Sequence, residues 1–231
     1  MGEILCFDDF CRELKNSGFS MGGGKAKGVY AVVPFSWENT PPDSVIRWHT
    51  GDPETDPWEW RMRVLEERSD IAYAKLFFGT SGYITADWYS DFLAVRREGM
   101  IFEEAYYSGK LTKMSARIYE VISENGATAL HDIKRLGGFG KEDNSGFERA
   151  LTELQMKMYI TMCGRMQKKN KFGEGYGWSS TVFETVESFW EKRGIELTEK
   201  QPQDAFEAIE ARIWQLNPKA DPKAVRKFIK G

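Results

Sequence analysis

The chain has 231 residues, of which 41% are hydrophobic and 29% are charged, and its net charge at pH 7 is −3. This composition is typical of a folded protein of one or two domains, and it argues against a protein that coats nucleic acid indiscriminately. No apolar run approaches the roughly 18 residues of a membrane span, and the first residues lack the pattern of a signal peptide, so we expect no membrane association.

Residues 1–100 are expected to form a small N-terminal α/β unit. Amphipathic periodicity and a proline in the first turn of the second helix predict its helices at residues 7–14, 58–67 and 86–96. Runs of β-branched and aromatic residues predict its strands at residues 28–35, 45–48, 71–78 and 83–85. The boundary with the next unit is expected within residues 97–110.

Residues 110–180 are predicted to form a winged helix-turn-helix. An apolar stripe within residues 114–122 predicts the first helix, which Asn125-Gly126 is expected to end. Thr128 is expected to cap a short second helix, and Ser145 is expected to open the third. Strand-like runs at residues 158–163 and 175–179 follow. Such an arrangement binds nucleic acid when the third helix enters a groove.

Residues 181–231 are predicted to form helices that pack on the winged helix. Their expected positions are residues 182–192, 202–216 and 221–229, the last with Asp221 as N-cap and Pro222 at its first position. The predicted fold class is therefore α+β and mostly helical, with the winged helix at its centre.

The positive charge gathers in the predicted wing. Between residues 156 and 172 there are five basic residues and no acidic one, and residues 165–171 are expected to form a basic hairpin tip. Phosphate contacts need such a local field. The expected nucleic-acid-binding residues are Arg149 of the third helix and Arg165, Lys168, Lys169 and Lys171. A solvated hairpin that carries lysines for solubility is the alternative, and the acidic residues near the start of the third helix weaken the case for tight binding.

A second candidate surface is the aromatic segment at residues 58–61. Trp58, Trp60 and Arg61 could line a pocket for a base or a phosphate, with Glu59 as its carboxylate. The alternative is a helix that packs these aromatic residues against another part of the chain.

The sequence contains few residues of the types that bind metals or cofactors. Only two histidines are present, and the three cysteines show no metal-binding spacing, which favours free thiols in a reducing cytoplasm. His49 and the nearby carboxylates could hold a hard cation, but a solvated acidic loop is the more common structure. We expect no metal and no cofactor.

Residues 151–155, the Gly164-Arg165 pair and residues 175–178 resemble the winged-helix units of AlkZ/YcaQ-type DNA glycosylases. Residues 56–61, 72–75 and 82–85 resemble a compact bacterial group described as AlkZ-related. This resemblance implies a DNA-binding protein of the DNA repair type.

The resemblance implies base excision only if the glycosylase catalytic motif is present. That motif is Gln, an apolar residue, then Asp or Gln, and it does not occur in the first 150 residues. Residues 201–203 match its letters with a proline in the middle, in a late linker. The leading hypothesis is therefore a winged-helix protein that binds nucleic acid, including damaged or branched DNA. A divergent glycosylase with Glu59 as its weak catalytic candidate, and a protein-interaction module without catalysis, remain the alternatives.

Overall fold

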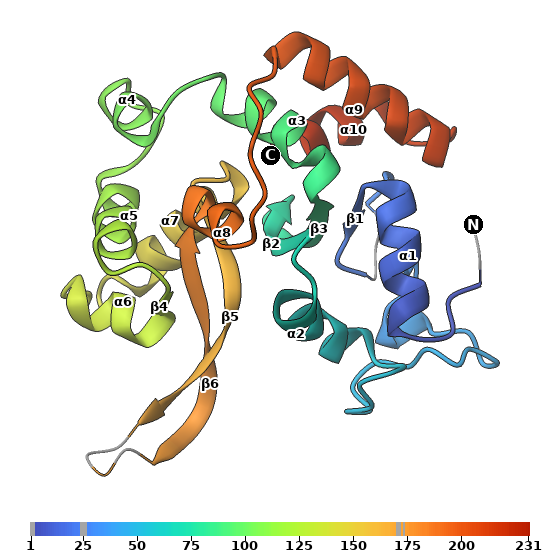
Figure 1. The fold of residues 1–231 in the computed structure, drawn as a ribbon, viewed down its shortest axis with the longest axis horizontal. Coiled ribbons are helices and arrows are strands. Elements are labelled where there is room, and N and C mark those ends of the chain that lie inside the picture. Colours follow the sequence, from blue (N-terminus) through green and yellow to red (C-terminus); the bar gives the residue numbers. More distant parts are fainter. Residues whose placement is uncertain (1–2, 24–26, 170–171, 173) are drawn as a thin grey trace. The chain divides into compact units, whose positions relative to one another are not determined.

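The computed structural model describes residues 3–23, 27–169, 172 and 174–231 (Figure 1). The chain divides into two compact units, one formed by residues 1–99 and 197–231 and the other by residues 100–196. Both units mix helices with antiparallel strands, as expected for the α+β class. None of the helices over the described residues combines the length and the apolar character that crossing a bilayer requires.

In the first unit, helices cover both faces of an antiparallel sheet. Strands β1 (Phe19–Met21), β3 (Thr80–Thr85) and β2 (Ile71–Phe77) pair in that order. The helices are α1 (Phe7–Ser17), η1 (Trp37–Asn39, a 3-10 turn), α2 (Pro57–Glu67), α3 (Ala86–Arg97), α9 (Pro202–Leu216) and α10 (Pro222–Lys230). On one face, Phe10 of α1 packs between Trp60 and Tyr83. On the other, Phe19 meets Phe92 and Phe228.

Two strands expected from the sequence do not form. The described residues 28–35 and 45–48 have no regular secondary structure, although residues 29–33 are buried. The first segment runs beside β1, where Met21 N donates to Tyr30 O and Val32 N donates to the Ser20 hydroxyl. A side-chain acceptor has replaced the next backbone acceptor, so no regular ladder develops.

The last two helices join the first unit, which corrects the expectation that all the helices of residues 181–231 pack on the winged-helix segment; the helix at Val186–Glu191 does lie in the second unit. Helices α9 and α10 pack against α3 and against each other. Phe228 of α10 stacks on Phe77 with ring centroids 3.8 Å apart. The buried Arg96 of α3 donates to the carbonyls of Phe228 and Ile229, so it holds the end of α10 in place. The N-cap prediction is confirmed, since Asp221 accepts a hydrogen bond from Ala224 N.

The second unit contains the segment predicted to be a winged helix. In chain order its elements are α4 (Phe102–Tyr107), α5 (Lys113–Asn125), β4 (Thr128–Ala129), α6 (Leu130–Leu136), α7 (Asn144–Met156), β5 (Ile160–Lys169), β6 (Gly175–Thr185) and α8 (Val186–Glu191). Strand β6 pairs antiparallel with both β5 and β4. Helix α5 packs on α7, and the Ser115 hydroxyl joins them by donating to Glu153 at 2.6 Å.

Three local expectations for this unit are wrong. Thr128 lies in β4 and its hydroxyl donates to Gly126 O, so it does not cap α6. Residues 182–185 extend β6, because Val182 and Phe183 pair with β4 and β5, and the helix after them is short. Residues 165–169 extend β5, so they do not form a hairpin tip.

One buried carboxylate organises the loop that leads into α2. Asp56 is fully buried and caps α2 by accepting from Trp58 N. It also accepts from the backbone N–H groups of His49, Thr50 and Gly51. A single side chain therefore satisfies four backbone donors and holds the turn that precedes the helix.

Replacing Asp56 by Ala is expected to lower the free energy of unfolding by about 3 kcal/mol, because it leaves several backbone donors without a partner. Urea denaturation followed by far-UV circular dichroism measures this loss. Asp221→Ala, which removes an exposed cap with one hydrogen bond, is the matched control and is expected to cost about 1 kcal/mol. Equal losses in the two variants would contradict this role for Asp56.

The ion pairs of Asp70 make the stability of the fold depend on pH. Burial raises the pKa of its carboxyl, but hydrogen bonds from Arg68 and Lys15 outweigh this and lower the pKa from 3.8 to about 2. The stabilisation is thus complete above pH 3.8 and is lost as the pH falls through about 2. Asp70→Asn is expected to cost about 1 kcal/mol at pH 6. In acid denaturation, the difference in unfolding free energy between Asp70→Asn and the unmodified protein should disappear as the pH falls from 3.8 to about 2. Asp43→Asn, in an exposed loop, is the control and should show no such difference at any pH.

Candidate nucleic-acid interface

The hairpin of β5 and β6 is buried at its base and exposed beyond it. Ile160, Met162 and Phe183 are buried, whereas residues 165–168 are exposed. The pairing shifts register between Met162 and Gly164, at the point where the strands leave the core. Such bulges bend and twist a strand. The distal half of the hairpin therefore presents its side chains to solvent.

Three of the basic residues predicted for the wing, Arg165, Lys168 and Lys169, belong to the part of β5 beyond Gly164. Arg165 pairs with Thr181 across the hairpin, and Lys168 pairs with Tyr176. Lys169 is the last residue of β5, and Lys171 lies outside the described residues. Within the part of the chain that the structure describes, no hydrogen bond or ion pair engages the Lys168 ammonium group, so its charge is available to a ligand.

Helix α7 buries one side and exposes the other. Its buried residues are those expected from the sequence, namely Phe147, Ala150, Leu151 and Leu154, together with Gln155. The exposed side of its first half carries Ser145, Glu148 and Arg149. Lys134 of α6 lies 3.4 Å from the Glu148 carboxylate, which offsets the negative charge there. Arg149 has no ion pair among the described residues.

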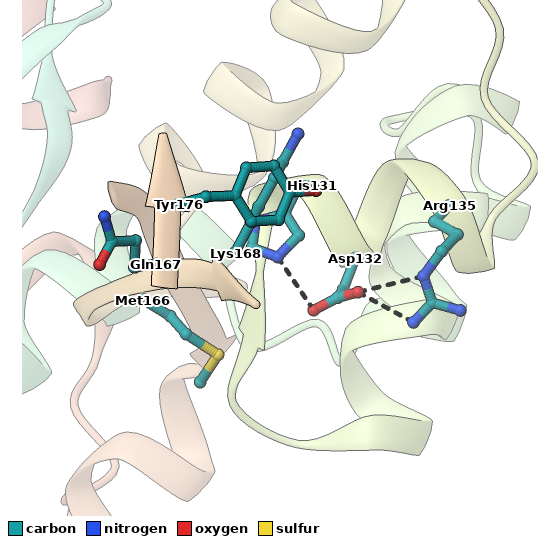
Figure 2. A pocket seen from close by; sticks show the side chains of 7 residues that line it. All are labelled: His131, Asp132, Arg135, Met166, Gln167, Lys168 and Tyr176. Carbon is teal, nitrogen blue, oxygen red and sulfur yellow. Dashed lines mark hydrogen bonds and ion pairs between the residues drawn. The ribbon is translucent and has the colours of Figure 1, made fainter. Parts of the chain in front are cut away.

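A pocket of about 610 Å³ lies between α6 and the hairpin (Figure 2). Its lining residues are His131, Asp132, Arg135, Met166, Gln167, Lys168 and Tyr176. Asp132 accepts from Arg135 at 2.8 Å, and its other oxygen lies 3.4 Å from His131 Nε2. Nothing in the sequence pattern brings α6 beside the hairpin, so this pocket could not be predicted from the sequence. The local excess of basic residues was the one signal that pointed to this region.

The structure separates the residues of the predicted aromatic pocket in the first unit. Trp60 is fully buried and stacks on Phe10, with its indole nitrogen donating to Glu54 O. Trp58 is exposed, and the Arg61 guanidinium lies 3.2 Å from the centroid of its ring. Trp60 is therefore a core residue and Trp58 a surface residue, so they do not line one pocket together. Glu59, on the same helix, is half-buried.

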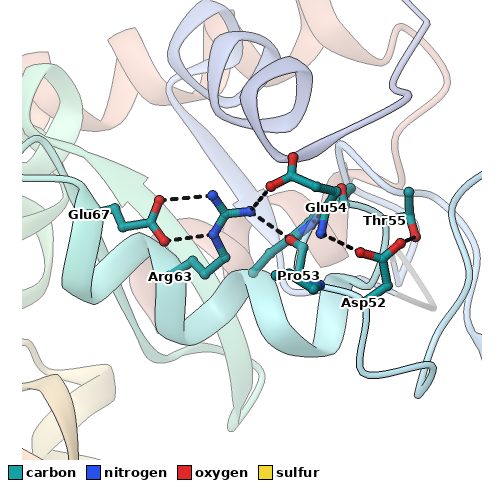
Figure 3. Close-up of polar contacts among 7 residues, drawn as sticks. Asp52, Pro53, Glu54, Thr55, Arg63 and Glu67 are labelled. Carbon is teal, nitrogen blue, oxygen red and sulfur yellow. Dashed lines mark hydrogen bonds and ion pairs between the residues drawn. The ribbon is translucent and has the colours of Figure 1, made fainter.

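The carboxylates of the acidic loop around residues 52–54 are engaged by neighbouring residues of the chain. Asp52 accepts from Glu54 N and from the Thr55 hydroxyl, while Arg63 binds Glu54 and Glu67 (Figure 3). Over the described residues, no three His, Cys, Asp or Glu side chains gather in a way that would hold a metal ion.

Two of the three cysteines are not activated nucleophiles. Cys6, Cys11 and Cys163 are free, as expected. Burial raises the pKa of both Cys11 and Cys163 to about 12. Because the thiolate is the reactive form, these two thiols are inert at neutral pH.

The chain matches the model of a family described as AlkZ related over residues 4–230. The chain belongs to the AlkZ-related family. A comparison with curated proteins gives no match. Among solved structures, the chain is similar to the Streptomyces sahachiroi DNA glycosylase AlkZ, with 11% identity and a TM-score of 0.41 over 75% of this chain. The match covers 50% of that glycosylase, so this AlkZ-related chain spans about half of its length.

The distinct positions of the two tryptophans lead to a test. Trp60→Ala is expected to lower the free energy of unfolding by about 4 kcal/mol, because it empties a large volume in the core. Trp58→Ala removes an exposed ring and is expected to cost less than about 1 kcal/mol. Urea denaturation followed by circular dichroism compares the two variants. Similar losses would contradict the assignment of Trp60 to the core and Trp58 to the surface.

Proposed function

We propose that the second unit is a winged helix and that it binds nucleic acid, with DNA as the partner. Helices α5, α6 and α7 are followed by the β5–β6 hairpin, and the short β4 before α6 pairs with β6. This is the element order of a winged helix, in which α7 would be the recognition helix and the hairpin the wing.

The observation that carries the proposal is the set of available cations on two neighbouring elements. Arg149 on α7 and Lys168 on β5 are exposed and have no ion pair among the described residues. Arg165 is also exposed on the hairpin and adds positive charge there, but it has a contact of its own and is not one of the two available cations. Phosphates bind such cations with release of counterions, whereas a cation already paired with a carboxylate gains much less. Lys169 and Lys171 belong to the proposed interface through their sequence positions.

The choice of DNA rests on the AlkZ-related family and on the sequence resemblance to DNA glycosylases. We propose damaged or branched DNA as the ligand, because the helix-plus-wing surface needs no catalytic group to recognise an altered duplex. Base excision has less support. The motif-like residues 201–203 form the start of α9, where Gln203 bonds to Glu207, and Glu59 lies on α2 in the other unit.

Arg149→Ala, Arg165→Ala and Lys168→Ala are each expected to weaken duplex DNA binding several-fold, because each removes one phosphate contact. The slope of log K against log salt concentration should fall by about 0.9 for each lost contact. Fluorescence anisotropy with a labelled duplex, between about 50 and 200 mM salt, measures both quantities. The triple change of Lys168, Lys169 and Lys171 to Ala should reduce binding most.

Lys223→Ala is the matched control, because it removes an exposed cation from α10 of the first unit. Its affinity and salt slope should equal those of the unmodified protein. Absence of binding at low salt, or binding that the triple change leaves intact, would overturn the proposal. Retention of DNA binding with capture of a protein on the same surface would instead extend it to an interaction module.

A further inference from the structure

The pocket between α6 and the hairpin has two chemically different walls. One wall carries cations, with Arg135 on α6 and Lys168 on β5. The other carries an apolar surface from Tyr176 and Met166, whose side chains are 52% and 46% exposed. Lys168 and Tyr176 are direct partners in the hairpin pairing, so the ammonium group and the ring start from adjacent positions.

Asp132 holds the Arg135 side chain in place on the cationic wall. Arg135 Nε and Nη2 both donate to Asp132 Oδ1, which orients the guanidinium and neutralises the carboxylate (Figure 2). The Lys168 charge is then left without a partner among the described residues. An anion in this pocket would therefore meet Lys168 directly and Arg135 through the guanidinium nitrogen that Asp132 does not occupy.

His131 fixes the two walls relative to each other. Its Nδ1 lies 2.8 Å from the Ser180 hydroxyl on β6, and its Nε2 faces Asp132. This contact joins α6 to the hairpin next to the pocket. It therefore fixes the backbone of α6, which carries Arg135, relative to the strands that carry Lys168 and Tyr176.

A nucleotide complements these two walls, because it has an anionic phosphate for the cations and a flat base for the apolar surface. A volume of about 610 Å³ lies within the usual range for small-ligand sites. A base can stack on Tyr176 only when it is not stacked within a duplex, because both faces of a paired base are otherwise covered.

We propose that this pocket binds one unstacked nucleotide of the bound strand, with its phosphate between Lys168 and Arg135 and its base on Tyr176. This inference rests on the proposed nucleic-acid binding and adds a substrate class to it. The protein then prefers DNA that contains an unpaired nucleotide over a continuous duplex.

The test compares a duplex carrying a single-nucleotide bulge with the fully paired duplex of the same sequence, by fluorescence anisotropy on the full chain. The unmodified protein should bind the bulged duplex about tenfold more tightly, the usual scale for stacking one base on an aromatic side chain. Tyr176→Ala should abolish this preference and leave binding to the paired duplex unchanged, whereas Tyr176→Phe should keep it. Lys168→Ala should weaken binding to the bulged duplex and reduce its salt slope by about 0.9, whereas Arg135→Ala, which removes a cation already paired with Asp132, should have a smaller effect.

Tyr107→Ala is the control for loss of an exposed aromatic ring, because Tyr107 lies on α4 of the same unit and outside this pocket. It should keep the preference for the bulge. Circular dichroism of each variant verifies folding. Binding to both duplexes without a preference, or a preference that survives Tyr176→Ala, would overturn the nucleotide pocket and leave the proposed function standing. Failure to bind either duplex at low salt would overturn both.

Discussion

The antiparallel pairing of β5 with β6 is the constraint on which the candidate interface depends. Its inner half is part of the core of the second unit, where Ile160, Met162 and Phe183 are buried. Beyond Gly164 the same strands continue into solvent. A two-stranded ribbon is marginally stable by itself in water, so the distal half takes its conformation from the buried half. The cations of the distal half therefore keep a fixed register relative to the elements packed on the base, which include α7 against β5 and α6 against β6.

Ion pairs with carboxylates decide which basic side chains of the second unit remain available to bind an anion. Lys134 lies against Glu148, Arg135 against Asp132, and Lys192 against the buried Glu184. In the sequence, the acidic residues near the start of α7 count against phosphate binding. In the structure, one of them is offset by Lys134 on the neighbouring helix. Arg149 and Lys168 are exposed and have no ion pair among the described residues, although the net charge of the chain is −3.

The first unit shows how far the sequence pattern reaches and where it stops. The predicted helices at α2, α3 and α9 match the structure closely, because amphipathic periodicity and an initial proline are local signals. Residues 28–35 have the composition of a strand and are largely buried, but they form none. Burial was readable from their apolar character. Strand formation also needs a free backbone partner, and the Ser20 hydroxyl occupies that place.

The candidate sites also have features that the sequence predicts and features that only the tertiary structure shows. The sequence by itself determined most of the helices and the basic run after α7, since each depends on residue types and short spacings. Only the tertiary structure decided that Trp60 belongs to the core while Trp58 faces solvent, that α10 packs on α3, and that His131 on α6 meets Ser180 on the hairpin. These outcomes depend on contacts between residues far apart in the chain, and the free energy of such contacts comes from packing and hydrogen-bond geometry that local periodicity does not encode.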